Sequence, residues 1–500
     1  MIKIKLKPSL FLFKKDKKST VVNLFFFSRW GCFQYATAII LLYLVMAGFI
    51  SCNNKSGAIT EINIGEHNHN EMKVQIDVKT ASAAQAYVEY WADSLGDSKK
   101  NVSATSITGL SHSLVICNII PQTNYSFDVV TIAAGVKTTS KKYPFKSRAL
   151  PVWLQDQFKY SCANLNVLPA VFKDGLMLMN KRETPGVAYL VDYKGQLKWY
   201  HTVDGTGFKV LHFTSDTSII SILGKNDEPT SYGSEILEIN LLGDTLLYIK
   251  KNQGDLKYSI HHEILKKNKN ELVTLYVDSR VVDLTAIGGN KKDTVNGDGI
   301  LILDRNGKKL WQWSVFDVMD PLADKDLLKT KKDWMHANSL NFDKDSNYII
   351  SFYNNGQIWK VDAHTGKIVW KFGKGGTFAM PAECDFTQSH AVHINKYGSL
   401  MFFDNGVEKK QSEVFAVKLD QASHTATIDF HFKLPVEVYN DRMGSAYMVT
   451  DSTILCCCSK KHITVLADKN GVLLWTLETA IPPYRVEFLE REKVMPYLQL

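Results

Sequence analysis

The stretch Leu301-Ile-Leu-Asp304-Arg-Asn-Gly307-Lys-Lys-Leu-Trp311 decides the fold of this chain, because versions of it recur along most of the sequence. It has the pattern of two strands joined by a tight turn, in which the aspartate supplies turn chemistry and the glycine takes a positive φ. The tryptophan is predicted to cover the neighbouring sheet. The copies place their turn aspartate or asparagine at Asp192, Asn240, Asp304, Asp362, Asp420 and Asp468, and the copy at Asp420 lacks the glycine.

The spacing of these hairpins predicts the architecture. Successive copies lie 48 to 64 residues apart, and a second strand pair precedes each hairpin, as in residues 342–350. Four strands per unit, repeated six times, predict a six-bladed β-propeller over residues 151–500. A β-helix is the alternative, but its repeats would be far shorter. The predicted fold class is therefore all-β.

Residues 55–150 have a different pattern, with alternating apolar and polar positions in segments such as 72–78 and 125–132. About seven such segments predict a small fibronectin III/Ig-like β-sandwich. The run Ile120-Pro121-Gln-Thr-Asn-Tyr125 resembles the fibronectin type III corner, in which the tyrosine hydroxyl binds back to the main chain. We find no catalytic motif here, so a spacer or interaction role is expected.

Composition and charge exclude several classes of protein. Hydrophobic residues make up 45% of the chain, which is typical of a packed core. Residues 1–51 carry seven lysines and one arginine against one aspartate, so nearly all of the net charge of +8 lies there. The remaining chain is almost neutral, which disfavours nucleic acid as a partner. The eight cysteines are too few for a disulfide scaffold and show no metal-ligand spacing.

The basic N-terminus resembles an export signal. An apolar run of fifteen residues, 36–50, is short for a membrane span and suits a signal peptide. Ser51 and Cys52 follow it in the manner of a bacterial lipobox, so residues 1–51 are predicted to be removed and Cys52 lipidated. The alternative is an uncleaved anchor helix. Both place the protein outside the cytoplasm, attached to a bacterial membrane on its periplasmic side or at the cell surface.

Histidines recur at matched positions of the repeats. Aligning three units on their first turns places His261, Asn338 and His390 at equivalent positions of successive blades. His336 lies two residues before Asn338 and shares its strand face, whereas His262 falls on the opposite face. Since the first strand of each blade faces the central channel, these side chains are expected to converge. Such a cluster would use imidazole as nucleophile, acid or ligand.

Three segments carry a family resemblance. His261-His262-Glu263, Asp333-Trp-Met-His336-Ala-Asn338 and Ser389-His390, the last followed by Phe403-Asp-Asn-Gly406, are similar to the arylsulfate sulfotransferase family. The resemblance covers roughly residues 60–500. It implies an exported propeller enzyme that moves a sulfuryl group from an aryl sulfate to a phenol through a transient sulfohistidine. It implies no nucleotide donor, no other cofactor and no metal.

Residue by residue, the resemblance makes His390 the nucleophile. His336, together with His261 or (if the register slips by one) His262, would bind the sulfuryl oxygens or protonate the leaving phenolate. Asn338 would orient one of these groups. Tyr353 and Trp334 are expected to stack on the donor ring.

The chain departs from the family at one position. Family members carry a Ser-x-Arg pattern shortly after the His-x-Asn strand, and here Ser351-Phe-Tyr353 has no arginine. Lys371, Lys374 or Arg442 could supply the missing cation.

Two other functions stay open: a non-catalytic propeller that binds a ligand or protein, and a metal-dependent hydrolase or lyase in which the histidines hold the ion. The sequence does not indicate an oligomeric state.

Overall fold

The structure is a computed structural model that describes residues 57–67, 70–117 and 119–494. The predicted export signal and Cys52 lie outside the described residues. Within these ranges, no helix is both long and apolar enough to cross a membrane.

The N-terminal domain contains the seven strands expected from the sequence, joined in one sheet. The central strand β2 is 19 residues long: its first half pairs with β1 and β4, and its second half pairs with β3 and β5. The sheet curls around one apolar core that includes Ile76, Leu114 and Phe127. The two halves are thus continuous through β2, a connection that alternation alone does not reveal. The strands are β1 (Ile59–Glu66), β2 (Val74–Ala92), β3 (Asn101–Val102), β4 (Gly109–Ile116), β5 (Asn124–Ala133), β6 (Val136–Thr139) and β7 (Tyr143–Lys146).

The corner expected at residues 120–125 is formed. The main-chain N–H of Ile120 donates a hydrogen bond of 2.9 Å to the hydroxyl of Tyr125. The ring of Tyr125 stacks on Phe145, with 5.4 Å between centroids. This bond fixes the chain where it turns into β5.

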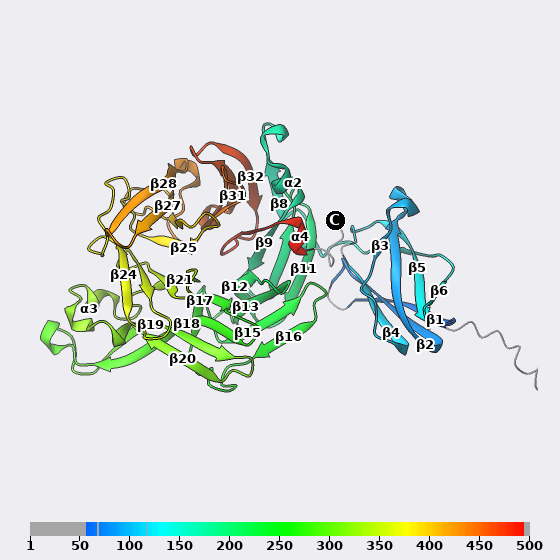
Figure 1. Cartoon of the computed structure of the whole chain (residues 1–500), viewed down its shortest axis with the longest axis horizontal. Helices are drawn as coiled ribbons and strands as arrows, with labels where there is room; N and C mark the ends of the chain where they lie inside the picture. Colours follow the sequence, from blue (N-terminus) through cyan, green and yellow to red (C-terminus); the bar gives the residue numbers. More distant parts are fainter. Residues whose placement is uncertain (1–56, 68–69, 118, 495–500) are drawn as a thin grey trace, which may run out of the picture. The chain divides into compact units, whose positions relative to one another are not determined.

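The rest of the described chain forms six antiparallel sheets in a ring, which confirms the all-β fold and the six-bladed propeller (Figure 1). The first strands of blades 2 to 5 surround the centre of the ring. In sheet order, blade 1 is β33 (Glu487–Leu489), β9 (Leu176–Lys181), β10 (Gly186–Val191) and β11 (Leu197–Val203); blade 2 is β12 (Gly207–Phe213), β13 (Ser218–Gly224), β15 (Glu235–Asn240) and β16 (Thr245–Ile249); blade 3 is β17 (Ile260–Lys266), β18 (Glu271–Val282), β19 (Asp293–Asp304) and β20 (Lys309–Ser314). Blade 4 is β21 (Ala337–Phe342), β22 (Tyr348–Phe352), β23 (Gln357–Val361) and β24 (Ile368–Gly373); blade 5 is β25 (Ser389–Ile394), β26 (Leu400–Asp404), β27 (Glu413–Asp420) and β28 (Thr425–Lys433); blade 6 is β29 (Ser445–Met448), β30 (Thr453–Cys458), β31 (Ile463–Asp468) and β32 (Leu473–Thr479).

Both ends of the propeller segment help to close the ring. The C-terminal β33 pairs with β9 of blade 1, and β8 (Phe158–Ser161) pairs with β32 of blade 6. The short strand β14 (Tyr232–Gly233) pairs with the start of β17. Within the described ranges the α-helices are short, about one turn each: α2 (Ala170–Asp174), α3 (Leu327–Thr330) and α4 (Arg491–Val494).

The recurring motif forms the last hairpin of each blade, as the sequence predicts. The Asp304 carboxylate accepts a hydrogen bond of 2.9 Å from the N–H of Lys308, and Gly307 has a φ of 81°. In the copy without glycine, His424 takes a φ of 53°. The indole of Trp199 donates to the Leu241 carbonyl in the turn of blade 2, at 2.7 Å. The tryptophan therefore ties one blade to the next.

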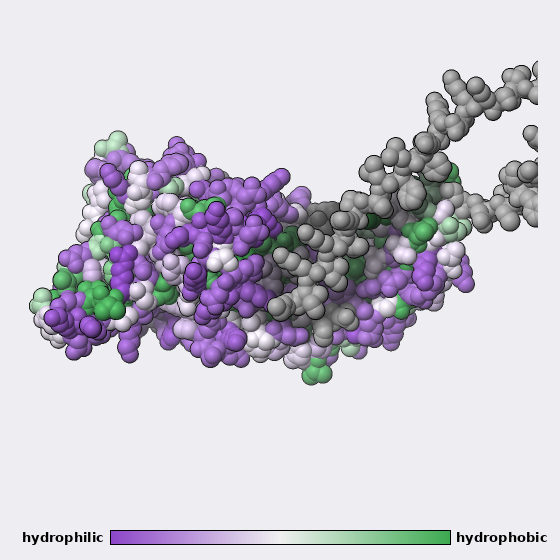
Figure 2. Space-filling model, turned by 90° about the horizontal axis from the view of Figure 1, so that it is seen from below, coloured by the Kyte–Doolittle hydropathy of each residue, from purple (hydrophilic) through white to green (hydrophobic). Residues whose placement is uncertain are grey.

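Apolar side chains are concentrated between the blades, where six of the seven hydrophobic clusters lie. On the face seen in Figure 2, hydrophilic side chains dominate and hydrophobic ones form small separate groups. The three adjacent cysteines of β30 are fully buried and unpaired. They fill space as small apolar side chains.

Candidate active site

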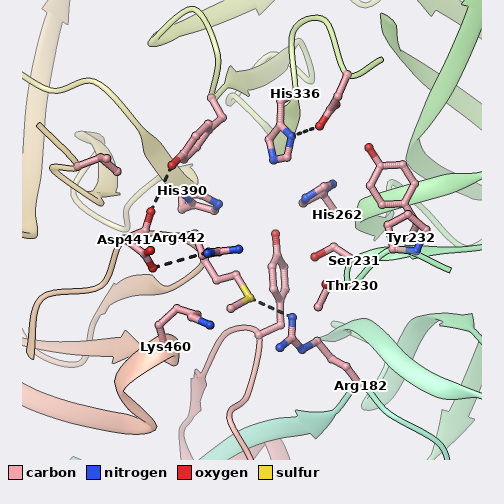
Figure 3. A pocket seen from close by; sticks show the side chains of 16 residues that line it. Arg182, Thr230, Ser231, Tyr232, His262, His336, His390, Asp441, Arg442 and Lys460 are labelled. Carbon is pink, nitrogen blue, oxygen red and sulfur yellow. Dashed lines mark hydrogen bonds and ion pairs between the residues drawn. The ribbon is translucent and has the colours of Figure 1, made fainter. Parts of the chain in front are cut away.

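A cavity of about 520 Å³ opens where β17, β21 and β25 begin (Figure 3). Three imidazoles line it: His262, His336 and His390. Tyr353 lines it as well, whereas His261, Asn338 and Trp334 do not. We call this space the histidine cavity. Its remaining lining is Arg182, Pro229, Thr230, Ser231, Tyr232, Asp333, Val407, Asp441, Arg442, Met443, Lys460 and Tyr484.

The structure corrects the expected placement of His261. The ladder between β17 and β18 shifts register between His261 and Ile264, and His262 takes a φ of 56°. This bulge turns His262 into the cavity and leaves His261 fully buried behind it. The two rings touch through their Nδ1 atoms at 2.8 Å. His262, the residue of the alternative register, is therefore the one that can meet a ligand.

Asn338 supports the site from behind. It is fully buried, and its amide donates a hydrogen bond of 2.8 Å to the carbonyl of Ser389, the residue before His390. Its side-chain oxygen accepts from the Ser351 hydroxyl. Asn338 therefore fixes the main chain at His390 and cannot touch a ligand in the cavity.

Trp334 belongs to the core between blades, not to the cavity. Its indole donates a hydrogen bond of 2.8 Å to Asp324, and its ring packs on Phe316 with 5.2 Å between centroids. An aromatic residue of the motif Asp-Trp-x-His is thus used for packing. The expected stacking on a donor ring is excluded for Trp334 in this arrangement, because the side chain is buried in that core.

His336 forms a pair with Asp333. Its Nδ1 lies 2.5 Å from Oδ2 of Asp333. Burial acts to lower the pKa of His336, but the hydrogen bond and negative charge of Asp333 outweigh it, so the pKa is raised. His336 is therefore the imidazole of the cavity that is suited to carry a proton at neutral pH.

The pKa of His390 is shifted in the opposite direction from that of His336. Burial, followed by the nearby positive charges of His336 and Arg485, lowers its pKa to about 3. Its Nδ1 is buried, with Asn405 and the main chain of Gln388 beside the ring, so Nε2 is the nitrogen that can meet a ligand in the cavity. A neutral imidazole with its proton on Nδ1 retains the lone pair of Nε2 for attack. His262 is also held neutral, since burial and the neighbouring His261 lower its pKa.

Tyr353 stands where the resemblance places an arginine. Its ring lies between two of the histidines, with centroid distances of 5.3 Å to His336 and 5.5 Å to His390. Its hydroxyl donates a hydrogen bond of 3.2 Å to the carbonyl of Asp441. The position therefore provides an aromatic wall and no positive charge.

Positive charges enter the cavity from other blades. Arg442, which the sequence suggested, lines it together with Arg182 and Lys460, which sequence reasoning missed. Lys371 does not line the cavity, because its ammonium lies over the ring of Trp359 at 4.0 Å. Lys374 is likewise absent from the lining. A signal for Arg182 existed: it lies in the polar run Asn180-Lys-Arg182-Glu-Thr184, which follows the apolar segment Leu176-Met-Leu-Met179.

A second, smaller space of about 150 Å³ lies between inner strands of the propeller. We call it the carboxylate cavity, because Glu263 and Glu487 line it together with His212 and Arg485. Arg485 donates to Glu263 at 2.7 Å and to the Asn338 carbonyl at 2.7 Å. His212 contacts both glutamates. The four charged groups of this cavity are thus paired with one another.

Across the described ranges, no group of three or more His, Cys, Asp or Glu side chains has an arrangement that could hold a metal ion. The three imidazoles line one cavity, but two of them are already paired with a neighbouring side chain, His262 with His261 and His336 with Asp333.

The fold and the site together define a six-bladed propeller whose inner strands place three imidazoles in one cavity. This chain belongs to the arylsulfotransferase (ASST) family, whose model matches residues 166–471. Membership supports aryl sulfotransferase activity in general, with aryl sulfates and phenols as small-molecule substrates. A comparison with curated proteins found no match.

Several solved structures share parts of the arrangement. A Bacteroides caccae protein of unknown function is 10% identical, with a TM-score of 0.40, and the match covers 63% of this chain and 99% of that one. A putative 6-phosphogluconolactonase from Bacteroides fragilis is 12% identical, with a TM-score of 0.36, covering 82% and 99%. An inactive virginiamycin B lyase from Staphylococcus aureus is 12% identical, with a TM-score of 0.32, covering 64% and 99%. At TM-scores this low, the likeness does not indicate a shared function.

Proposed function

We propose that the protein transfers a sulfuryl group from an aryl sulfate to a phenolic acceptor through a sulfohistidine formed on His390. The observation that carries the proposal is a contrast within one cavity: the ring of His390 is held neutral, with Nε2 as its accessible nitrogen, whereas the pKa of His336 is raised so that it can carry a proton. Nucleophile and acid need opposite protonation states at the same pH.

In the first half-reaction, a lone pair of the His390 ring attacks sulfur. The bond between sulfur and the aryl oxygen breaks, and its electron pair leaves on the phenolate. Protonated His336 gives its proton to that oxygen, and the N–H of His262 stabilises the sulfuryl oxygens. Phenolate is a fair leaving group, so modest acid catalysis suffices.

In the second half-reaction, a phenol occupies the place of the departed product. His336, now neutral, takes the hydroxyl proton while the phenol oxygen attacks sulfur. The bond between nitrogen and sulfur breaks, and its electron pair returns to His390. Asn338 is a positioning residue in both steps, since it holds the main chain beside His390. Tyr353 supplies an aromatic wall for the phenol ring.

We also propose that the protein works outside the cytoplasm, attached to a bacterial membrane through lipid on Cys52. The support is the sequence alone: a basic segment, a short apolar run and a small residue before the cysteine. Globomycin-sensitive processing, with radiolabelled palmitate incorporated in the wild type and not in Cys52→Ala, is the expected result. Palmitate incorporation into the variant would contradict it.

Activity is tested on the full chain with 4-nitrophenyl sulfate as donor and phenol as acceptor. We expect release of nitrophenolate that depends on the acceptor, is insensitive to chelator, and falls at least about a thousandfold in His390→Ala. His364→Ala is the matched control, since it removes an imidazole from an exposed turn of blade 4. Acid-labile sulfate on the wild type, absent from His390→Ala, would identify the intermediate.

Two results would overturn the proposal. No release from any aryl sulfate, with a folded protein, would favour a propeller that only binds its ligand. Loss of activity with chelator, restored by a divalent ion, would favour metal-dependent chemistry on the same histidines.

A further inference from the structure

The histidine cavity contains positive charges that the proposed sulfuryl transfer does not use. Arg182 follows β9 of blade 1, and Lys460 lies in the turn after β30 of blade 6. In Figure 3 both lie on the side of the cavity away from His336. We call these two residues the cationic end of the cavity.

Arg182 is a buried charge without a counterion. Only 5% of its surface is exposed, and no carboxylate oxygen lies within 4.0 Å of it among the residues that the structure describes. One of its terminal nitrogens contacts the sulfur of Met443 at 2.9 Å, and its Nε has no partner. Buried charges are normally paired, because desolvation disfavours a lone ion. Arg182 therefore lacks the anion that such a position requires.

Two other arginines near the cavity each have a carboxylate partner. Arg485 is equally buried and donates to Glu263 at 2.7 Å. Arg442, at the mouth of the histidine cavity, has Asp441 beside it at 3.7 Å. Lys460 is exposed, unlike Arg182, but its ammonium also has no carboxylate within ion-pair distance in the described part of the chain. Two unpaired cations thus line one cavity.

The sulfuryl group under attack is not the missing anion. The charges that act most strongly on His390 are those of His336 and Arg485, and those on His262 come from the neighbouring imidazoles and Arg485. The charges that act most strongly on Arg182 are those of the adjacent Glu183 carboxylate and then of Tyr484. Figure 3 shows Arg182 and Lys460 on the side of the cavity away from His336, and Tyr484 and Met443 form an aromatic and apolar wall of the same cavity.

We propose that Arg182 and Lys460 bind a second anionic group of the aryl substrate, at the end of the molecule away from the reacting oxygen. This deepens the proposed function, on which it rests. The substrate class is aromatic sulfates and phenols with an acidic substituent, a carboxylate or sulfonate. The guanidinium of Arg182 offers a planar fork that suits a two-oxygen anion, and a cavity of about 520 Å³ has room for the ring between the two sites.

Binding tests the inference without any turnover. Calorimetry with the full chain compares 4-hydroxybenzoate with 4-hydroxybenzamide, which replaces the carboxylate by a neutral group of similar shape. We expect the carboxylate to bind about tenfold tighter or better. This preference should shrink to near parity in Arg182→Gln and fall in Lys460→Gln. Lys181→Gln is the matched control, because Lys181 binds the Pro185 carbonyl and lies outside the cavity.

Turnover measurements show whether Arg182 binds the acidic substituent of the substrate or its sulfuryl group. The donors are 4-sulfooxybenzoate and 4-sulfooxybenzamide, and each variant is compared with the wild type so that intrinsic leaving-group differences cancel. We expect Arg182→Gln to lower kcat/KM for the carboxylate donor about tenfold more than for the amide donor. If both donors lose equally, Arg182 acts on the sulfuryl group and the inference is wrong.

The remaining outcomes separate the inference from the function on which it rests. Equal binding of the two phenols to the wild type overturns the inference even if sulfuryl transfer occurs. Preferential binding that depends on Arg182, without turnover of any donor, would sink the sulfotransferase proposal and keep the anion site. If Arg182→Gln does not fold, Arg182→Lys and the exposed Lys460→Gln carry the same comparison.

Discussion

The histidine cavity and the carboxylate cavity are both lined by residues of β17, but their charged side chains differ: those of the carboxylate cavity are paired, and some of those in the histidine cavity are not. Consecutive residues of β17 serve both: His262 faces the first and Glu263 the second. In the carboxylate cavity His212, Glu263, Arg485 and Glu487 neutralise one another. In the histidine cavity the two cations Arg182 and Lys460 have no carboxylate within ion-pair distance among the residues that the structure describes. Charge that is paired holds blades together, whereas charge left unpaired is available for a ligand.

The largest effect is expected from breaking the paired cavity. Arg485→Met removes one of the two cations that contact buried Glu263 and leaves only His212 to pair with it, so we expect the free energy of unfolding to fall by about 3 kcal/mol. Urea denaturation followed by tryptophan fluorescence measures this. The matched control, Arg442→Met, removes an exposed guanidinium and should change stability by less than about 1 kcal/mol. Equal stability of the two variants would show that the pair between Arg485 and Glu263 is not structural.

A smaller effect, on activity alone, is expected in the histidine cavity. Asp333→Asn removes the charge that raises the pKa of His336, so less of that imidazole is protonated near neutral pH. We expect kcat to fall about tenfold to a hundredfold, with the midpoint of the alkaline limb moving to lower pH. Initial rates between pH 5 and pH 10 measure both. A lower rate with an unmoved limb would mean that Asp333 acts through structure only.

The pH dependence of stability separates the cavities further. Burial opposes the charged form of His212, but Glu263 and Glu487 raise its pKa to about 10, above the value of 6.5 expected for an unfolded chain. Its stabilising contribution is therefore complete below about pH 6.5 and is lost as the pH rises through 10. In thermal melts we expect His212→Gln to lose this alkaline decline. His390→Gln is the comparison, since neutral His390 should leave the decline in place.

The smallest effect is expected at Tyr353. Its hydroxyl bonds to the Asp441 carbonyl, and its ring stays against His336 and His390 if the hydroxyl is removed. Tyr353→Phe should cost about 0.5–1.5 kcal/mol of stability and change kcat/KM less than threefold, or about 0.7 kcal/mol. A loss of a hundredfold would place the hydroxyl in the reaction.

Much of the fold follows from local pattern. The Asp-x-x-Gly turns predict the last hairpin of each blade, because a turn needs only its own residues to form. The contact from Trp199 to the next blade follows from the same motif. The closing strand β33 does not, because its three residues pair with β9, some 300 positions away. No local pattern specifies a partner at that distance.

The site was predicted less completely. His336, His390 and Tyr353 were named from motif positions, and they line one cavity. The choice between His261 and His262 depended on a bulge, which a single residue of positive φ creates. Trp334 and Asn338 belong to the motif but serve packing and main-chain position. Arg182 and Lys460 come from blades 1 and 6, outside any motif, and only the closed ring brings them to the histidines.

The sequence by itself determined the all-β class of this protein and its six repeated hairpins, because each hairpin depends on a short segment with its own turn residues. It also determined the family, because the histidine motifs that carry the resemblance are short and contiguous. The tertiary structure alone decided which imidazole meets a ligand, which charges are neutralised and which remain free. The physical reason is that burial and pairing set the charge and the lone pairs of a side chain, and both depend on residues that the ring closes around it from other blades.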